Sequence, residues 1–297
     1  MKACFISVVV VAAFFLVAIA EAQVGSSWRG SNREQSEQDV AHAQQSGASK
    51  ARQREKPKPP FRLTPQQNAQ VDHVLRVWEK HSSMVKTFEC PFTRFEYDLV
   101  FGPQDKPKYI DQGNIKFAAP DKGYFEVLGQ RPEKWVCNGK SIFEYKFNSR
   151  QVVEHQLPPE IQGKGITDGP LPFMFGARAE KLKSRYFVRI VTPKQIKNQI
   201  WLETYPKFQR DAANYSRVDV ILNTRNMQPS AIQVHSPNEK NRTVYKLDDN
   251  PKINATDLFS FLKDDPFQAR APLGWTKIVE QPAVPRLSRQ QSRNARN

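Results

Sequence analysis

The sequence has few of the residues and motifs on which enzyme catalysis depends. It contains three cysteines and five histidines, and it has no Cys-x-x-Cys pair, which excludes a thioredoxin-like redox site. The signatures of serine hydrolases, zinc peptidases, P-loop proteins and dinucleotide-binding enzymes are absent as well. No histidine is paired with a plausible nucleophile or shows metal-ligand spacing. We therefore expect a protein that is not an enzyme and that uses neither a metal nor a cofactor.

Basic residues outnumber acidic ones, but they do not form a known nucleic-acid-binding motif. The formal net charge is +15 at pH 7. The Lys and Arg residues are scattered, and no RNP, KH or zinc-finger pattern accompanies them. We therefore expect no nucleic-acid partner, while an anionic membrane surface or an envelope protein stays open as a partner.

A long hydrophobic run is found only at the N-terminus. The run from Phe5 to Ala20 follows a lysine and ends in Ala20-Glu21-Ala22, a small-x-small sequence typical of signal-peptidase cleavage. The run is short for a membrane span. We predict that residues 1–22 are a signal peptide and that the mature protein is exported to the periplasm in soluble form; an uncleaved N-terminal anchor is the alternative.

Two polar segments flank the central part of the chain. Residues 23–60 are rich in Ser, Gln, Arg and Lys, and residues 281–297 are rich in Arg. Such compositions bury too little apolar surface to offset the entropy cost of ordering. We predict a disordered linker at 23–60, one folded domain at 61–280 and a disordered basic tail at 281–297.

The folded domain is predicted to begin with an amphipathic helix. Thr64 and Gln67 form a capping box around Pro65, which suits the first helical position. Apolar residues then recur at the spacing of one helical face. They are Val71, Val74, Leu75 and Trp78.

From Lys86 onward the apolar period drops to two, which predicts about eleven short strands. Asn138-Gly139 marks a hairpin turn, and Phe143, Tyr145 and Phe147 share one face of the following strand. So many sequential strands favour an α+β fold with a single, strongly curved antiparallel sheet. After the first six strands, we expect five more at Tyr186–Val191, Ile200–Tyr205, Val218–Leu222, Ala231–His235 and Thr243–Leu247, and a short one at Leu258–Leu262.

The first strand has an irregular pattern. Its apolar residues follow one parity up to Phe92 and the other parity from Phe95 onward. A slip of one residue predicts a β-bulge, and Pro91 predicts an edge or distorted strand. Cys90 in this strand and Cys137 could form a disulfide in an oxidising compartment, with two buried thiols as the alternative.

Four segments in this order resemble the Lol-type lipoprotein carriers, LolA and LolB. They are Gly113–Pro120, Cys137–Tyr145, Gly169–Phe175 and Trp201–Lys207, preceded by the export signal and the amphipathic helix. The resemblance implies an unclosed antiparallel barrel whose apolar concave side is covered by helices and receives acyl chains. One position departs from the family: its helix-latching Arg corresponds to Ala119 here, which puts a family-type lid cycle in doubt.

Two functions follow as hypotheses. The first is a periplasmic, monomeric carrier or binder of lipid or lipoprotein acyl chains. The second is an envelope interaction or sensor protein that uses the same fold to bind a peptide, polymer or regulator. For the first, the ligand-binding candidates are a lid of Trp78, Leu171, Phe173, Met174 and Phe175, and a wall of Phe88, Phe117, Phe125, Trp135, Phe143, Tyr145 and Trp201.

Overall fold

The computed structural model describes residues 58–103, 105–160, 162–163, 178–255 and 265–280. The predicted signal peptide, nearly all of the linker and the basic tail lie outside these residues and stay predictions. The same holds for the strand predicted at Leu258–Leu262 and for the lid residues Leu171, Phe173, Met174 and Phe175.

The N-terminal helix α2 (Pro65–Ser83) begins at the predicted capping box. The Thr64 hydroxyl accepts a hydrogen bond from the Gln67 amide at 3.2 Å, and the Gln67 side chain accepts one from the Thr64 amide at 2.9 Å. The stripe residues Val71, Leu75 and Trp78 are buried. The local pattern therefore predicted both the start of the helix and the face that it buries.

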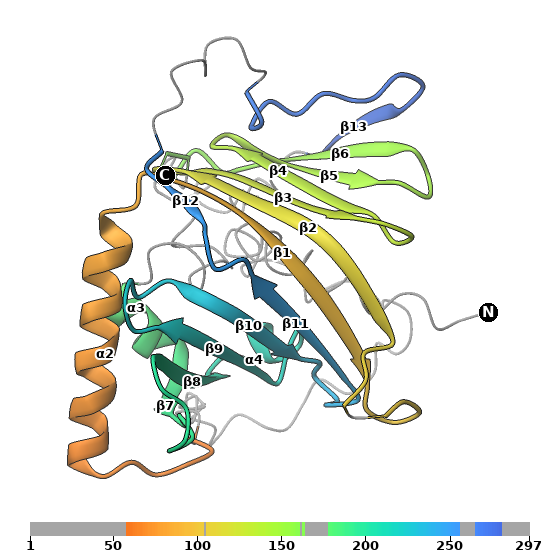
Figure 1. Cartoon of the computed structure of the whole chain (residues 1–297). Coiled ribbons are helices and arrows are strands. Elements are labelled where there is room, and N and C mark those ends of the chain that lie inside the picture. Colours follow the sequence, from red (N-terminus) through yellow and green to blue (C-terminus); the bar gives the residue numbers. More distant parts are fainter. Residues whose placement is uncertain (1–57, 104, 161, 164–177, 256–264, 281–297) are drawn as a thin grey trace, which may run out of the picture.

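The described strands form a single curved sheet that does not close into a barrel (Figure 1). Its strand order is β13-β6-β5-β4-β3-β2-β1-β11-β10-β9-β8-β7, and β12 pairs with β1 beside β11. The predicted fold class is confirmed. The strands are β1 (Thr87–Asp98), β2 (Tyr109–Ala118), β3 (Lys122–Leu128), β4 (Glu133–Asn138), β5 (Ser141–Lys146), β6 (Gln151–Gln156), β7 (Tyr186–Ile190), β8 (Gln199–Pro206), β9 (Arg217–Asn223), β10 (Pro229–His235), β11 (Asn241–Leu247), β12 (Lys252–Ile253) and β13 (Thr276–Glu280).

One strand pair departs from the expected antiparallel order. Strand β13 adds to the edge of the sheet in parallel with β6, with Ile278 opposite Val153. The segment that leads into β13 crosses the outer face of the sheet, where Trp275 packs on Tyr145 and Phe147. The parallel direction follows because the chain reaches this edge through a long connection and not through a hairpin.

The predicted bulge in β1 is wrong. The strand pairs with β2 in continuous register from Thr87 to Glu96, and its buried positions keep one parity throughout. The inward positions that follow Phe92 are Arg94 and Glu96, whose side chains are charged and buried. The apolar parity changes because the inward face turns from apolar to ionic, while the backbone stays regular.

Pro91 is also placed differently from the prediction, because β1 lies in the middle of the sheet. The Pro91 carbonyl accepts a hydrogen bond from the Asp248 amide, so its backbone faces the gap between β11 and β12. A missing N–H disturbs no ladder bond there.

The two faces of the sheet carry separate apolar clusters. The concave face, on which α2 packs, holds the main core, which joins residues of α2, of β1 to β5 and of β7 to β11. Helix α3 (Ala179–Arg185) adds Leu182 to this core, and α4 (Gln209–Ala212) lies at the end of β8. A smaller cluster of Val136, Phe143, Tyr145 and Val152 lies on the opposite, convex face under Trp275.

Candidate functional site

On the concave face of β1 to β4, the inward residues of neighbouring strands lie side by side in rows across the sheet. Two of these rows contain four aromatic side chains, which we call the aromatic wall. Each of the four is at most 6% exposed. Trp78 of α2 belongs to the same core. The first row is Phe88, Phe117, Gly123 and Cys137, and the second is Cys90, Ile115, Phe125 and Trp135.

A third row ends the wall and requires a glycine. Phe92 pairs with Gly113 across β1 and β2, and its ring stacks on Phe125 at a centroid distance of 5.1 Å. A Cβ at Gly113 would lie 2.3 Å from the Phe92 ring. The glycine therefore lets this ring lie flat over the backbone, which keeps the concave surface smooth at this point.

Two of the predicted wall residues lie on the wrong face. Phe143 and Tyr145 point away from the concave side into the convex cluster, and the Tyr145 hydroxyl donates to the Arg270 carbonyl at 3.0 Å. Period two correctly indicated that they share a face. It did not indicate which face, and the adjacent strand β4 places Trp135 and not Val136 on the concave side.

Trp201 is likewise not part of the wall. In β8 the buried neighbour Leu202 takes the concave position, so Trp201 lies on the opposite face and is half-buried. Its indole N–H donates to the Gln199 side chain at 2.8 Å. The structure thus brings five of the predicted site residues together, namely Trp78, Phe88, Phe117, Phe125 and Trp135.

Of the two alternatives that the sequence left open for the cysteines, the structure has the two buried thiols and not the disulfide. Cys90 and Cys137 are both free thiols, and β2 and β3 lie between their strands. Three inter-strand spacings separate the strands by about 14 Å, far beyond disulfide reach. The Cys90 Sγ donates to the Pro91 carbonyl and the Cys137 Sγ to the Asp121 carbonyl, both at 3.2 Å. Burial raises the pKa of each thiol to about 11.

We therefore expect both thiols to react slowly with alkylating reagents. In the native protein at neutral pH, iodoacetamide should leave Cys90 and Cys137 unlabelled, because both are buried and protonated. After unfolding without a reductant, peptide mapping should find both labelled. A disulfide-linked peptide pair in the unreduced sample would contradict the structure.

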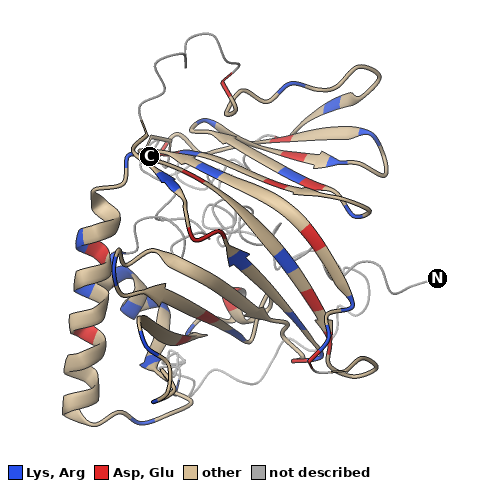
Figure 2. Ribbon diagram, in the orientation of Figure 1, with Lys and Arg blue, Asp and Glu red and all other residues tan. Residues whose placement is uncertain are grey.

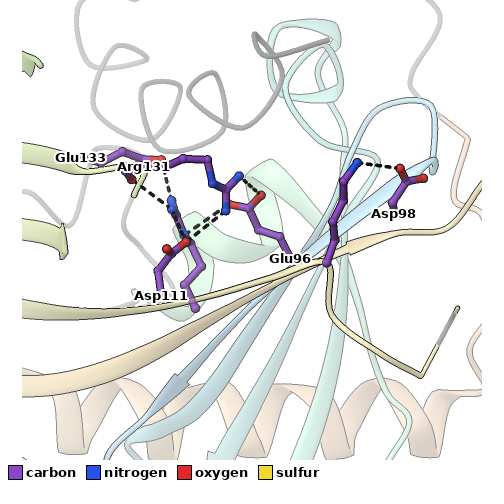
Figure 3. Close-up of polar contacts among 7 residues, drawn as sticks. Glu96, Asp98, Asp111, Arg131 and Glu133 are labelled. Atoms are coloured by element: carbon purple, nitrogen blue, oxygen red, sulfur yellow. Dashed lines mark hydrogen bonds and ion pairs between the residues drawn. The ribbon is translucent and has the colours of Figure 1, made fainter. Parts of the chain in front are cut away.

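Beyond the aromatic wall, the concave face carries a buried ionic cluster. Figure 3 shows its polar contacts. Arg94, only 1% exposed, lies at its centre and donates to Asp111 at 2.8 Å and to Glu133 at 2.5 Å. Its Nε lies 3.3 Å from Glu96 Oε1. Arg131 donates to Glu96 at 2.6 Å and to Asp111 at 3.1 Å, which completes a network of two guanidinium groups and three carboxylates.

At the solvent side of this cluster, Arg131 stacks on an aromatic ring. The Arg131 guanidinium carbon lies 3.7 Å from the centre of the Tyr109 ring. Arg131 is 27% exposed, whereas the side chains of Asp111 and Glu133 are each 8% exposed. Arg131 and Tyr109 therefore lie between solvent and the buried carboxylates.

Burial dominates the electrostatics of Glu133. Its pKa is raised above the ordinary value because of desolvation, which outweighs the attraction of Arg94. The pKa of the nearby Tyr245 hydroxyl is also raised, first by desolvation and then by the charge of Glu133. Arg94 keeps its charge, since carboxylates raise its pKa against the effect of burial.

The sequence interpretation missed this cluster. The signal was present in β1, where Arg94 and Glu96 continue the inward parity of Phe88, Cys90 and Phe92. Acidic residues at the corresponding places of β2 and β4, Asp111 and Glu133, could not be aligned with them before the register was known.

The surface carries its charges in mixed order. In Figure 2, basic and acidic positions are interspersed over the strands and α2 and do not gather in one basic field. Of the helices in the described residues, none is long and apolar enough to cross a membrane.

No protein-family model matches the chain, and no curated protein matches it. Solved structures do. An uncharacterized conserved protein from Thermus thermophilus has a TM-score of 0.42 at 10% identity, over 72% of this chain and 100% of that one. A LolA superfamily protein from Nitrosomonas europaea has a TM-score of 0.32 at 10% identity, over 63% and 94% of the two chains.

The Mycobacterium tuberculosis lipoprotein LppX has a TM-score of 0.36 at 9% identity, over 64% of this chain and 98% of its own. A LolA superfamily protein is among the solved structures that this chain is similar to.

Proposed function

We propose that this protein is an exported binding or carrier protein, not an enzyme, that takes the hydrocarbon part of a lipid or lipoprotein on the concave face of its sheet. The observation that supports this is the continuous aromatic wall of Phe88, Phe117, Phe125 and Trp135, placed on the face that α2 covers. In this proposal the acyl chain packs along these rings.

The energy scale is adequate for such a ligand. Burying one CH₂ group contributes about 0.8 kcal/mol, so one long acyl chain supplies on the order of 10 kcal/mol before the costs of binding are subtracted. The segment Leu171–Phe175, which lies outside the described residues, keeps its proposed role as the apolar lid. Export to the periplasm and a monomeric state belong to the same proposal.

The test uses two matched substitutions. Phe125→Leu changes the concave wall, whereas Phe143→Leu changes a ring of the convex cluster with nearly the same burial, 5% against 6% exposed. We expect Phe125→Leu to weaken binding of a neutral fluorescent probe such as N-phenyl-1-naphthylamine about tenfold, and Phe143→Leu to leave it within about twofold.

Both variants should lose similar stability, so thermal unfolding controls for damage to the fold. Absence of probe binding by the folded wild-type protein would reject the proposal, as would equal weakening by the two variants. Lipid extraction and mass spectrometry of protein purified from its native envelope would then identify the natural ligand.

A further inference from the structure

The ionic cluster and the aromatic wall share one continuous surface. Glu133 lies on the same face of β4 as Trp135. Across the sheet it pairs with Val127 of β3, and Val127 pairs with Gly113 of β2. The Phe92 ring lies over Gly113. One strand residue separates Glu133 from Trp135. A ligand whose hydrocarbon part lies along the rings can therefore place its polar end beside Glu133.

One oxygen of this buried carboxylate has no hydrogen-bond partner among the described residues. Glu133 is 8% exposed; its Oε1 accepts from Arg94, while its Oε2 accepts from none of the described groups. The Oε1 of Glu96 is also without a hydrogen bond there, although it lies 3.3 Å from the Arg94 Nε. Buried carboxylate oxygens without donors are costly.

The charges of the cluster do not balance. Glu96, Asp111 and Glu133 contribute three negative charges, and Arg94 and Arg131 contribute two positive ones. With all five groups ionised, the buried cluster therefore has a net charge of −1. One additional cation at the free oxygen of Glu133 would neutralise it and would satisfy its missing hydrogen bond.

We propose that the polar end of the concave site, at Glu133, recognises a protonated amine, so that the preferred ligands are amphiphiles with an ammonium group next to their hydrocarbon. This rests on the proposed function, because the hydrocarbon must lie on the aromatic wall. The ammonium donates to Glu133 Oε2, and Arg94 holds the other oxygen of the same carboxylate in place. The formal net charge of +15, taken alone, would instead favour an anionic ligand.

The test compares three probes of equal chain length, dodecylammonium, dodecanol and dodecanoate. Their dissociation constants are measured below micelle formation by displacement of N-phenyl-1-naphthylamine at neutral pH. We expect dodecylammonium to bind at least about tenfold more tightly than dodecanoate, with dodecanol between them. In Glu133→Gln, dodecylammonium should lose its advantage and bind no more tightly than dodecanol.

Glu126→Gln is the matched control, since this carboxylate lies on the convex side of β3 and accepts from the Tyr124 hydroxyl at 2.6 Å. It should keep the preference for the amine. Equal or tighter binding of dodecanoate to the wild-type protein overturns the inference, and so does an equal loss of all three probes in Glu133→Gln. Binding of dodecanol without any amine preference leaves the proposed function standing and rejects only the headgroup, whereas binding of none of the three rejects both.

Discussion

Replacing Arg94 by Met is expected to lower the free energy of unfolding by about 3–5 kcal/mol. The Arg94 side chain is 1% exposed and is the closest cation to Glu133, at 2.5 Å. Met fills a similar volume but leaves a buried carboxylate without its partner, and Arg131 compensates only Glu96 and Asp111. Urea denaturation with linear extrapolation measures the difference.

The loss should depend on pH in one direction. Because the folded state already raises the pKa of Glu133, the contribution of its protonated form is present at low pH and is lost as the pH rises through that pKa. Removal of Arg94 raises this pKa further. The deficit of Arg94→Met should therefore be smaller at about pH 5 than at about pH 8.

A surface pair provides the control for this variant. Arg189 binds Glu203 at 2.5 Å on the convex face, but its side chain is 36% exposed. Arg189→Met should cost no more than about 1 kcal/mol. A deficit for Arg94→Met that is no larger than this, or that grows toward acid pH, would contradict the buried network.

Replacing Trp78 by Ala is expected to cost about 3–5 kcal/mol of unfolding free energy. Trp78 is 1% exposed and joins α2 to the core of the concave face. The loss combines the transfer energy of a large ring with the cavity that it leaves, since backbone on both sides restrains collapse. Thermal and urea unfolding should agree on the effect.

The chain offers a second tryptophan for comparison. Trp201 is half-buried on the convex side of β8, and its indole N–H donates to the side chain of the nearby Gln199. Trp201→Ala should cost about 1 kcal/mol. If both substitutions cost the same, Trp78 is not the anchor that its burial indicates.

The sequence predicted correctly those features of the fold that depend on residues close together in the chain. The capping box at Thr64 and Gln67 places the start of α2, because both partners lie within one helical turn. The strand predicted at Val218–Leu222 lies within one residue of the observed ends of β9, because its apolar residues alternate clearly. These features depend on nearby residues only.

The candidate site was only partly predictable, because it depends on which face of each strand is concave. Phe125 and Phe143 have equally aromatic surroundings in the sequence, yet the register places them on opposite faces. Arg94 was not identified as a site residue for a related reason, because the change of apolar parity after Phe92 predicted a bulge and not a charged inward position. Its carboxylate partners come from β2 and β4, and only the strand pairing brings them to it.

The convex cluster also implies an order of events in folding. The hydrogen bond from Tyr145 to Arg270 closes a stretch of 125 residues, and β13 can pair with β6 only after that stretch is in place. Contacts between residues so distant in sequence form late, because closing the long loop between them costs conformational entropy. Every residue of β13 is exposed, and among the described strands it pairs with β6 alone. In hydrogen exchange, the amides of β13 should therefore open well before those of β1 and β2, and the last strand to dock should be the first to leave.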